Sequence, residues 1–280
     1  MNQRKSLKEL NLLDKFLFDE AMDDPENVKT MLDIILSQNT NLKHPPQTEK
    51  EQRTSTDNRQ IRLDVYAIDE DDVIYEVEAQ KENTHNLPKR SRLYQGIIDS
   101  KLLPPGVVDF NLLNEVLIVL IMPFDLFGYG LYRYTFQMSC EEVPELKLDD
   151  GATRIFLNMR GKHPELVSSE LIELLKYMEH STDEVSESCK SKRVQDMHRR
   201  VCQIRASEKT EVKYMQSWEE KILIKQEGIV EGKLEGEKEL LKRQISKKLA
   251  KNYFAEQISE MLEIDISEIE NIIKEMHNEK

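Results

Sequence analysis

The residue types most suited to chemistry lie in a short stretch where apolar and polar residues alternate. Asp64 stands in one alternating segment, and Glu76, Glu78 and Gln80 stand in the next, across the acidic turn 69–72. Alternation with a period of two predicts an antiparallel hairpin, with these polar side chains on the face opposite the apolar set. If the turn places residue 64 opposite residue 78, the two Cβ atoms lie roughly 5 Å apart.

Two carboxylates held that close repel each other unless a cation or a proton lies between them. Such a pair can chelate Mg²⁺, which prefers oxygen ligands, and the ion can activate a water and neutralise charge on a phosphodiester. The alternative is that these acids only hydrate an exposed strand face, because 53 of the 280 residues are Asp or Glu. Spacing alone leaves both interpretations open.

The elements that must position this pair follow from the apolar periodicity. We expect helices over 6–22, 25–36 and 87–103, and strands over 61–68, 73–80, 116–121, 132–138 and 154–158. This order predicts an α/β core, a mixed sheet flanked by helices. The stretch 37–58 is polar with two prolines and predicts a loop or a partly strand-like connection.

Beyond residue 164 the sequence shows only helical patterns. We expect four segments: a core domain (1–163), a helical extension (164–211), a long charged helix (212–252) and a terminal helical hairpin (253–280). In the long helix, Gly228, Gly232 and Gly236 recur every four residues, and each weakens an isolated helix by about 1 kcal/mol. Either a close helix–helix contact offsets this cost or the region is a flexible polar linker.

The composition of the chain limits the kinds of partner that the protein can bind. The formal net charge of −13 argues against a uniformly basic surface that coats DNA, although six basic residues against one Asp in 190–205 form a local stripe. That stripe either follows a DNA backbone or pairs with acidic neighbours. No apolar segment has the length of a membrane span and residues 1–10 lack the apolar core of a secretion signal, so we expect a cytoplasmic protein without a membrane partner.

The spacing of the cysteines and histidines in the sequence predicts no further metal or catalytic site. Cys140, Cys189 and Cys202 show neither a CxxC pair nor Cys/His ligand spacing, so neither a disulfide framework nor a structural zinc site is expected. His85 and His198 have no partner at a spacing that makes them metal ligands or general bases.

Asp64, followed on the next strand by Glu78-x-Gln80, resembles the PD-(D/E)XK nuclease signature. The surrounding segments resemble the recombination-promoting nuclease and transposase branch of that superfamily over most of residues 10–280: FLFDEAMDDPENVK (16–29), LPKRSRLYQGIIDS (87–100), IMPFDLFGYGLYRYTF (121–136) and LDDGATRIFLNMRGK (148–162). The resemblance implies a restriction-endonuclease-like core and Mg²⁺-dependent cleavage of DNA, with Mn²⁺ as a substitute ion.

The resemblance also implies roles for single residues. Asp64 and Glu78 match the metal ligands, although Leu63 stands where the signature has proline. Gln80 occupies the usual lysine position, so it can orient a water or a phosphate but supplies no positive charge, and the adjacent Lys81 is expected on the other face. Some nucleases of this superfamily use a further acid on the first helix.

For that further acid we favour Glu20 over Asp19. Glu20 falls within the apolar arc of its helix, where a carboxylate needs a reason to be. The alternative is an acid at the helix end that reaches solvent.

In the helix after the hairpin, Arg90, Tyr94 and Gln95 are candidates for substrate contact, because residues four apart share a helix face. Arg90 would contact a phosphate, and the alternative is a surface cation. The first functional hypothesis is therefore a Mg²⁺-dependent DNA endonuclease associated with recombination or a mobile element. The second is an inactive nuclease-like module that binds DNA or oligomerises. Either one is expected to form homo-oligomers through the C-terminal helix.

Overall fold

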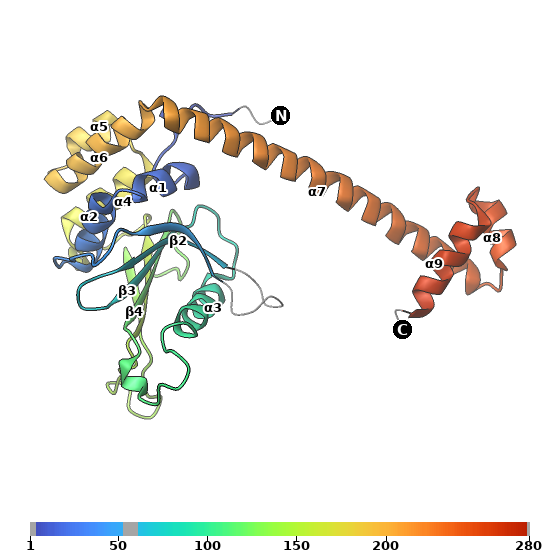
Figure 1. The fold of residues 1–280 in the computed structure, drawn as a ribbon, viewed down its shortest axis with the longest axis horizontal. Helices are drawn as coiled ribbons and strands as arrows, with labels where there is room; N and C mark the ends of the chain where they lie inside the picture. Colours follow the sequence, from blue (N-terminus) through green and yellow to red (C-terminus); the bar gives the residue numbers. More distant parts are fainter. Residues whose placement is uncertain (1–3, 53–60, 279–280) are drawn as a thin grey trace. The chain divides into compact units, whose positions relative to one another are not determined.

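In the computed structural model (Figure 1), which describes residues 4–52 and 61–278, six strands form a mixed sheet. Their order is β1-β2-β3-β4-β6-β5. The strands are β1 (Gln47–Gln52), β2 (Ile61–Ile68), β3 (Ile74–Ala79), β4 (Val116–Met122), β5 (Arg133–Phe136) and β6 (Ala152–Asn158). β3, β4 and β6 are parallel, and the other neighbouring pairs are antiparallel. The expected α/β, restriction-endonuclease-like sheet flanked by helices is confirmed.

The hairpin between β2 and β3 is held by the side chain of Asp69. Its Oδ1 accepts hydrogen bonds from the backbone N–H groups of Asp71 and Val73, at 3.0 and 2.9 Å. Its Oδ2 accepts the hydroxyl of Tyr75 at 2.7 Å, and Asp72 adopts a left-handed φ of 61°. Asp side chains stabilise turns in this way, so the acidic turn of the sequence fixes the register of the hairpin.

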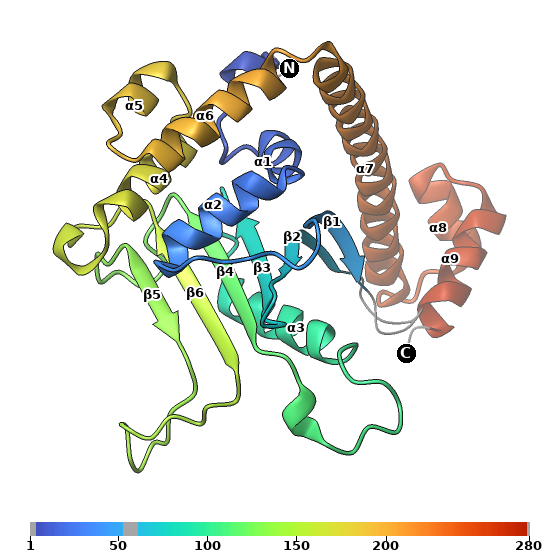
Figure 2. The same ribbon diagram turned by 60° about the vertical axis from the view of Figure 1, so that its left-hand side comes forward.

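Helices cover both faces of the sheet. The helices that pack around it are α1 (Lys15–Met22), α2 (Pro25–Leu36), α3 (Leu87–Asp99), α4 (Ser169–Glu179), α5 (Asp183–Ser188) and α6 (Lys192–Arg205). α2 begins as expected at the Asp24 cap, whose carboxylate accepts the N–H of Glu26, with Pro25 as its first residue. Figure 2 shows α1, α2 and α4 to α6 on one face of the sheet and α3 on the other.

Two apolar layers follow from this arrangement. On the first face, Val77, Val119 and Ile155 pack against residues of α1, α2, α4 and α6. On the second face, Ile118 and Leu120 pack against residues of α3. The strand face opposite the first apolar layer is therefore covered as well, and polar side chains on it are buried.

The elements differ from the sequence prediction at three places. The first predicted helix divides into a short 3-10 turn, Leu7–Glu9, and α1. The polar stretch 37–58 contributes the edge strand β1, and its residues 53–58 lie outside the described part of the chain. The helix predicted over 87–103 ends at Asp99, before the prolines that follow.

Contacts divide the chain into two compact units, Met1–Tyr214 and Met215–Lys280, with the boundary inside α7 (Glu208–Leu249). In the second unit α8 (Ala255–Leu262) and α9 (Ile266–Asn278) pack with the end of α7 around Ile245, Ile258 and Ile269. No helix in the described residues is both long enough and apolar enough to cross a bilayer. The division into four segments made from the sequence remains a prediction.

Candidate active site

Asp64 and Glu78 occupy adjacent strands at matching positions. In the β2–β3 pair, Val65 lies opposite Val77 and Tyr66 lies opposite Glu76. The ladder between these strands ends at the Val65–Val77 pair, and Asp64 and Glu78 are the next residues on the two strands. Leu63 and Tyr66 both pack on the α3 side, so the alternation of β2 is interrupted near Asp64, whose carboxylate reaches Lys15 of α1. The charge of Asp64 nevertheless acts on Glu76 and Glu78, so the hairpin brings the three acids near one another.

The three acids are buried. Asp64, Glu76 and Glu78 are 7%, 0% and 8% exposed. Helix α3 covers the face of β3 that carries Glu76 and Glu78, whereas Asp64 pairs with Lys15 of α1. Burial of a charged carboxylate is costly unless a cation, a proton or hydrogen bonds compensate for the lost hydration. Burying three acids at one place is therefore expected to lower the stability of the folded state, so a functional role explains their position better.

Two cations reach the acids from opposite sides of the sheet. The Lys15 Nζ on α1 lies 2.7 Å from Asp64 Oδ1, 3.1 Å from Asp19 and 3.7 Å from Glu49. The Arg90 Nη2 on α3 donates to Glu78 Oε1 and to Gln80 Oε1, each at 2.5 Å. Gln80 follows the end of β3, where its N–H donates to the carbonyl of Ile121. Asp64 thus pairs with Lys15, and Glu78 pairs with Arg90.

The electrostatics of the acids are strongly perturbed. Burial raises the pKa of Glu78 to about 7, against the opposing effect of Arg90. Burial, followed by the charges of Glu78 and Asp64, raises the pKa of Glu76 well above its ordinary value. Burial also raises the pKa of Asp19 to about 7, with Lys15 opposing the shift. Titratable groups with shifts of this kind are concentrated at functional sites.

The carboxylate oxygens at this site are suited to a divalent cation. Both oxygens of Glu76 and the Oε2 of Glu78 are buried without a hydrogen-bond partner among the described residues. Buried polar atoms are normally paired, so oxygens left without a donor are candidates for metal ligation. The donor set of Asp64, Glu76 and Glu78 therefore fits the chemistry of Mg²⁺ or Mn²⁺, and these residues could hold such an ion.

Comparison with known families adds an independent observation. The model of the PD-(D/E)XK nuclease family transposases matches residues 15–232. The chain belongs to this family. No curated protein and no solved structure matches the chain significantly.

Of the three α3 residues predicted to contact substrate, two face the acids. The Arg90 guanidinium lies 5.8 Å from the centre of the Tyr94 ring. Burial, followed by the charge of Glu78, raises the pKa of the Tyr94 phenol. Gln95 instead donates to Asp99 at 2.9 Å, one turn further along α3, and is 7% exposed. In this member of the PD-(D/E)XK family, the structure thus places Arg90 and Tyr94 beside Glu78, whereas the contact it shows for Gln95 is to Asp99.

The preference for Glu20 over Asp19 is not supported by the geometry. The carboxylate of Glu20 pairs with Lys213 at 2.9 Å, and the preceding turn of the same helix face packs Phe16 against Tyr214. The apolar arc that contains Glu20 is therefore covered by the first turns of α7. It is Asp19 that shares Lys15 with Asp64. Of the two acids, Asp19 is thus the one that lies near Asp64, through their shared contact with Lys15.

Three residues of the site, Glu76, Lys15 and Asp19, were not selected as site residues from the sequence. Glu76 was placed on the correct face, but its complete burial depends on α3, which the hairpin pattern does not reveal. Lys15 and Asp19 are four residues apart on α1, a spacing typical of a helical ion pair. That spacing could have drawn attention to the pair, but their position beside Asp64, 49 residues from Lys15, comes from the fold.

The adjacent Lys81 points elsewhere, as expected. Its Nζ pairs with Asp14 at 2.5 Å. The basic stripe 190–205 is also largely used within the protein: Arg193 pairs with Glu170, and Arg200 donates to Asn27 at 2.7 Å. Pairing with neighbouring groups, the second of the two interpretations, is therefore what the structure shows for these arginines.

Proposed function

We propose that this member of the PD-(D/E)XK nuclease family is a metal-dependent endonuclease that hydrolyses phosphodiester bonds of DNA. The observation that carries the proposal is the buried group of Asp64, Glu76 and Glu78, in which three carboxylate oxygens lack a hydrogen-bond partner among the described residues. Stability alone gives no reason to bury these acids together.

Asp64 and Glu78 would hold Mg²⁺, and Mn²⁺ is expected to substitute. When bound, the ion supplies Lewis-acid stabilisation of the negative charge that develops on the phosphodiester. Arg90 would move from Glu78 and Gln80 to a phosphate oxygen, which its planar guanidinium recognises well. Gln80 would then orient the attacking water through its amide.

Lys15 offers a positive charge that the glutamine at the lysine position of the family signature cannot supply. Gln80 stands at the position of a lysine and carries no charge, but the ammonium of Lys15 lies 2.7 Å from Asp64. Burial lowers the pKa of Lys15, yet Asp64 and Asp19 outweigh this effect and the net pKa is raised, so the group stays charged. We infer that Lys15 supplies the positive charge that Gln80 does not.

A role in recombination or in a mobile element is part of the same proposal and is supported by the name of the family, PD-(D/E)XK nuclease family transposase. A cytoplasmic location, where DNA is accessible and thiols stay reduced, is supported by three free cysteines.

Self-association through α7 completes the proposal. Ile229, Val230 and Leu234 are each about 60% exposed, and Cβ atoms built on Gly232 and Gly236 meet no atom within 4 Å. A helix with exposed apolar residues and small residues on its surface can pack closely on a second copy. Light scattering of the full-length protein at micromolar concentration should give at least a dimer mass, and a monomer mass would refute this part of the proposal.

Nicking of supercoiled plasmid tests the enzymatic proposal. Wild-type protein should nick the plasmid with Mg²⁺ or Mn²⁺ but not with chelator, and Asp64→Ala and Glu78→Ala should each abolish nicking while circular dichroism stays unchanged. Equal nicking by all three proteins would show that the activity comes from a contaminant. Absence of both nicking and metal-dependent thermal stabilisation in the wild type would favour an inactive DNA-binding or oligomerisation module.

A further inference from the structure

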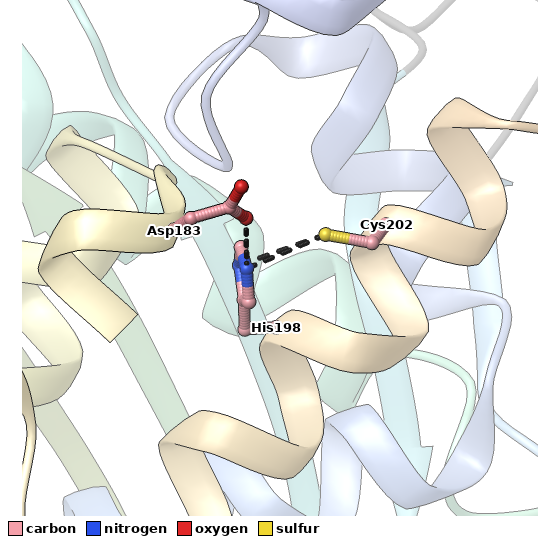
Figure 3. A group of neighbouring side chains, drawn as sticks. All are labelled: Asp183, His198 and Cys202. Atoms are coloured by element: carbon pink, nitrogen blue, oxygen red, sulfur yellow. Dashed lines mark hydrogen bonds and ion pairs between the residues drawn. The ribbon is translucent and has the colours of Figure 1, made fainter. Parts of the chain in front are cut away.

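A second group of metal-ligating side chains lies outside the candidate active site, on α5 and α6. Among the residues that the structure describes, Asp183, His198 and Cys202 each offer one ligand atom, and these atoms lie within 4.8 Å of one another (Figure 3). His198 and Cys202 are four residues apart on α6, so a single turn brings them to one face. Asp183 is the first residue of α5.

The nitrogen–sulfur distance is close to that of two ligands of one ion, but the sulfur must move. His198 Nε2 lies 3.4 Å from Cys202 Sγ and 2.8 Å from Asp183 Oδ1. The sulfur also lies 3.9 Å from Nδ1, so it stands beside the ring, and a change of the Cys202 rotamer is needed to bring it in front of Nε2. In a tetrahedral zinc site, with Zn–S near 2.3 Å and Zn–N near 2.0 Å, the nitrogen and sulfur stand about 3.5 Å apart. The Asp183 oxygen must move outward by about half an ångström, and its side chain is 79% exposed and able to do so.

The other ring nitrogen of His198 already has the partner that a metal-binding histidine needs. Nδ1 lies 3.0 Å from the hydroxyl of Tyr177, a residue of α4 with no exposed surface. When Nε2 binds an ion, the ring proton is on Nδ1, and Nδ1 donates a hydrogen bond to the hydroxyl oxygen of Tyr177. Contacts of this kind fix the tautomer and ring orientation of metal-binding histidines.

We propose that Asp183, His198 and Cys202 bind a divalent transition-metal ion, with Zn²⁺ the best match to an oxygen, nitrogen and sulfur donor set. This proposal departs from the expectation that neither Cys202 nor His198 has ligand spacing, because a spacing of four on one helix can supply two ligands. The third comes from α5 and becomes apparent only in the fold.

A nucleophilic role for the cysteine fits the site less well. Burial, followed by the charge of Asp183, raises the pKa of the Cys202 thiol, although Arg205 opposes the shift. A thiol with a raised pKa is a poor nucleophile, but a bound metal ion displaces its proton to solvent. The Arg205 guanidinium donates to the carbonyls of Ser181 and Leu10, so its charge is already engaged.

The ion would fasten the helices that cover the first face of the sheet. Asp183 lies two residues after Ser181, whose hydroxyl accepts the N–H of Leu12 at 2.9 Å. Leu12 lies just before α1, the helix that carries Lys15 and Asp19. Occupancy would therefore stabilise this layer without any contact to Asp64 or Glu78.

Cobalt titration of the full-length, chelator-treated protein tests the proposal. Equimolar Co²⁺ should produce a thiolate-to-cobalt charge-transfer band that Zn²⁺ removes. Cys202→Ser should abolish the band, whereas Cys140→Ser, the matched change of a thiol elsewhere, should leave it unchanged. Asp183→Asn, a substitution of an exposed side chain that should not affect folding, should weaken Co²⁺ binding by about tenfold or more.

The double variant Asp64→Ala, Glu78→Ala separates this site from the proposed nuclease site. It should keep the cobalt band while losing plasmid nicking. If the wild type shows no thiolate band, or if the band survives Cys202→Ser, the proposal is overturned and the group is an Asp–His hydrogen bond beside an unrelated thiol.

Discussion

The Arg90 guanidinium on α3 lies 2.5 Å from the Glu78 carboxylate on β3. The same Nη2 atom donates to the side-chain oxygen of Gln80. Arg90 thus contacts both Glu78 and Gln80, the second and third residues of the nuclease signature. In the proposed mechanism its guanidinium would leave these two side chains and bind a phosphate. A Lys at this position could not reproduce the planar donor geometry.

Removal of Arg90 should therefore affect catalysis more than binding of metal. We expect Arg90→Ala to slow plasmid nicking by about a hundredfold, the usual effect of losing a donor to developing negative charge. Arg90→Lys should recover only part of that loss. Arg92→Ala is the matched control, since Arg92 is exposed on the same helix. Nicking rates of the two alanine variants that agree within twofold would contradict the role assigned to Arg90.

The raised pKa values of the acids predict an unusual pH dependence of stability. The folded state holds protons on Glu76 and Glu78 at a pH where the unfolded chain has released them. Their contribution is complete below the ordinary glutamate pKa and is lost as pH rises through the raised pKa. For Glu78, with a pKa of about 7, the loss amounts to up to about 3 kcal/mol.

Urea unfolding in chelator measures this effect. The unfolding free energy should fall between about pH 5 and about pH 7.5. Carboxylates with a lowered pKa, such as Asp14 and Glu170, are already ionised in this range. Glu76→Gln should make the fall shallower, and Glu145→Gln, a change of an exposed acid, should leave it unchanged. A stability that increases over the range, or equal slopes for the two variants, would exclude this account.

The hairpin and its pair of acids were predictable because strand alternation and turn chemistry are local. Asp64 and Glu78 are the next residues beyond the Val65–Val77 pair, in a hairpin whose turn is held by Asp69. The choice between Asp19 and Glu20 was not predictable in this way. A helical wheel shows that Glu20 lies in an apolar arc, but not that this arc meets Lys213, which is 193 residues away in the sequence.

The two acids of α1 can be separated by experiment. Asp19→Asn should slow nicking by about tenfold, because Lys15 loses one of the carboxylates that hold it beside Asp64. Glu20→Gln should leave nicking within about twofold, since it removes only a contact to a partly exposed lysine. A larger loss of activity with Glu20→Gln than with Asp19→Asn would restore Glu20 as the acid of the first helix.

Lys15 offers the sharpest test of how this chain functions with glutamine at the signature lysine position. Its ammonium is held by Asp64, Asp19 and Glu49, so the charge lies beside the proposed metal ligands. Lys15→Gln should reduce nicking by about a hundredfold if this charge stabilises the transition state. Lys81→Gln is the matched control, because the ion pair of Lys81 is with Asp14 and not with the proposed metal ligands.

The variants of Lys15 also separate catalysis from metal binding. Without the competing ammonium, Asp64 is free to bind a cation, so Lys15→Gln should bind Mn²⁺ at least as tightly as the wild type in calorimetry. Transfer of the charge by the double variant Lys15→Gln, Gln80→Lys should recover part of the lost activity, because it restores a lysine at the family position. If Lys15→Gln cuts plasmid at the wild-type rate, the charge beside Asp64 has only a structural role and Gln80 functions without it.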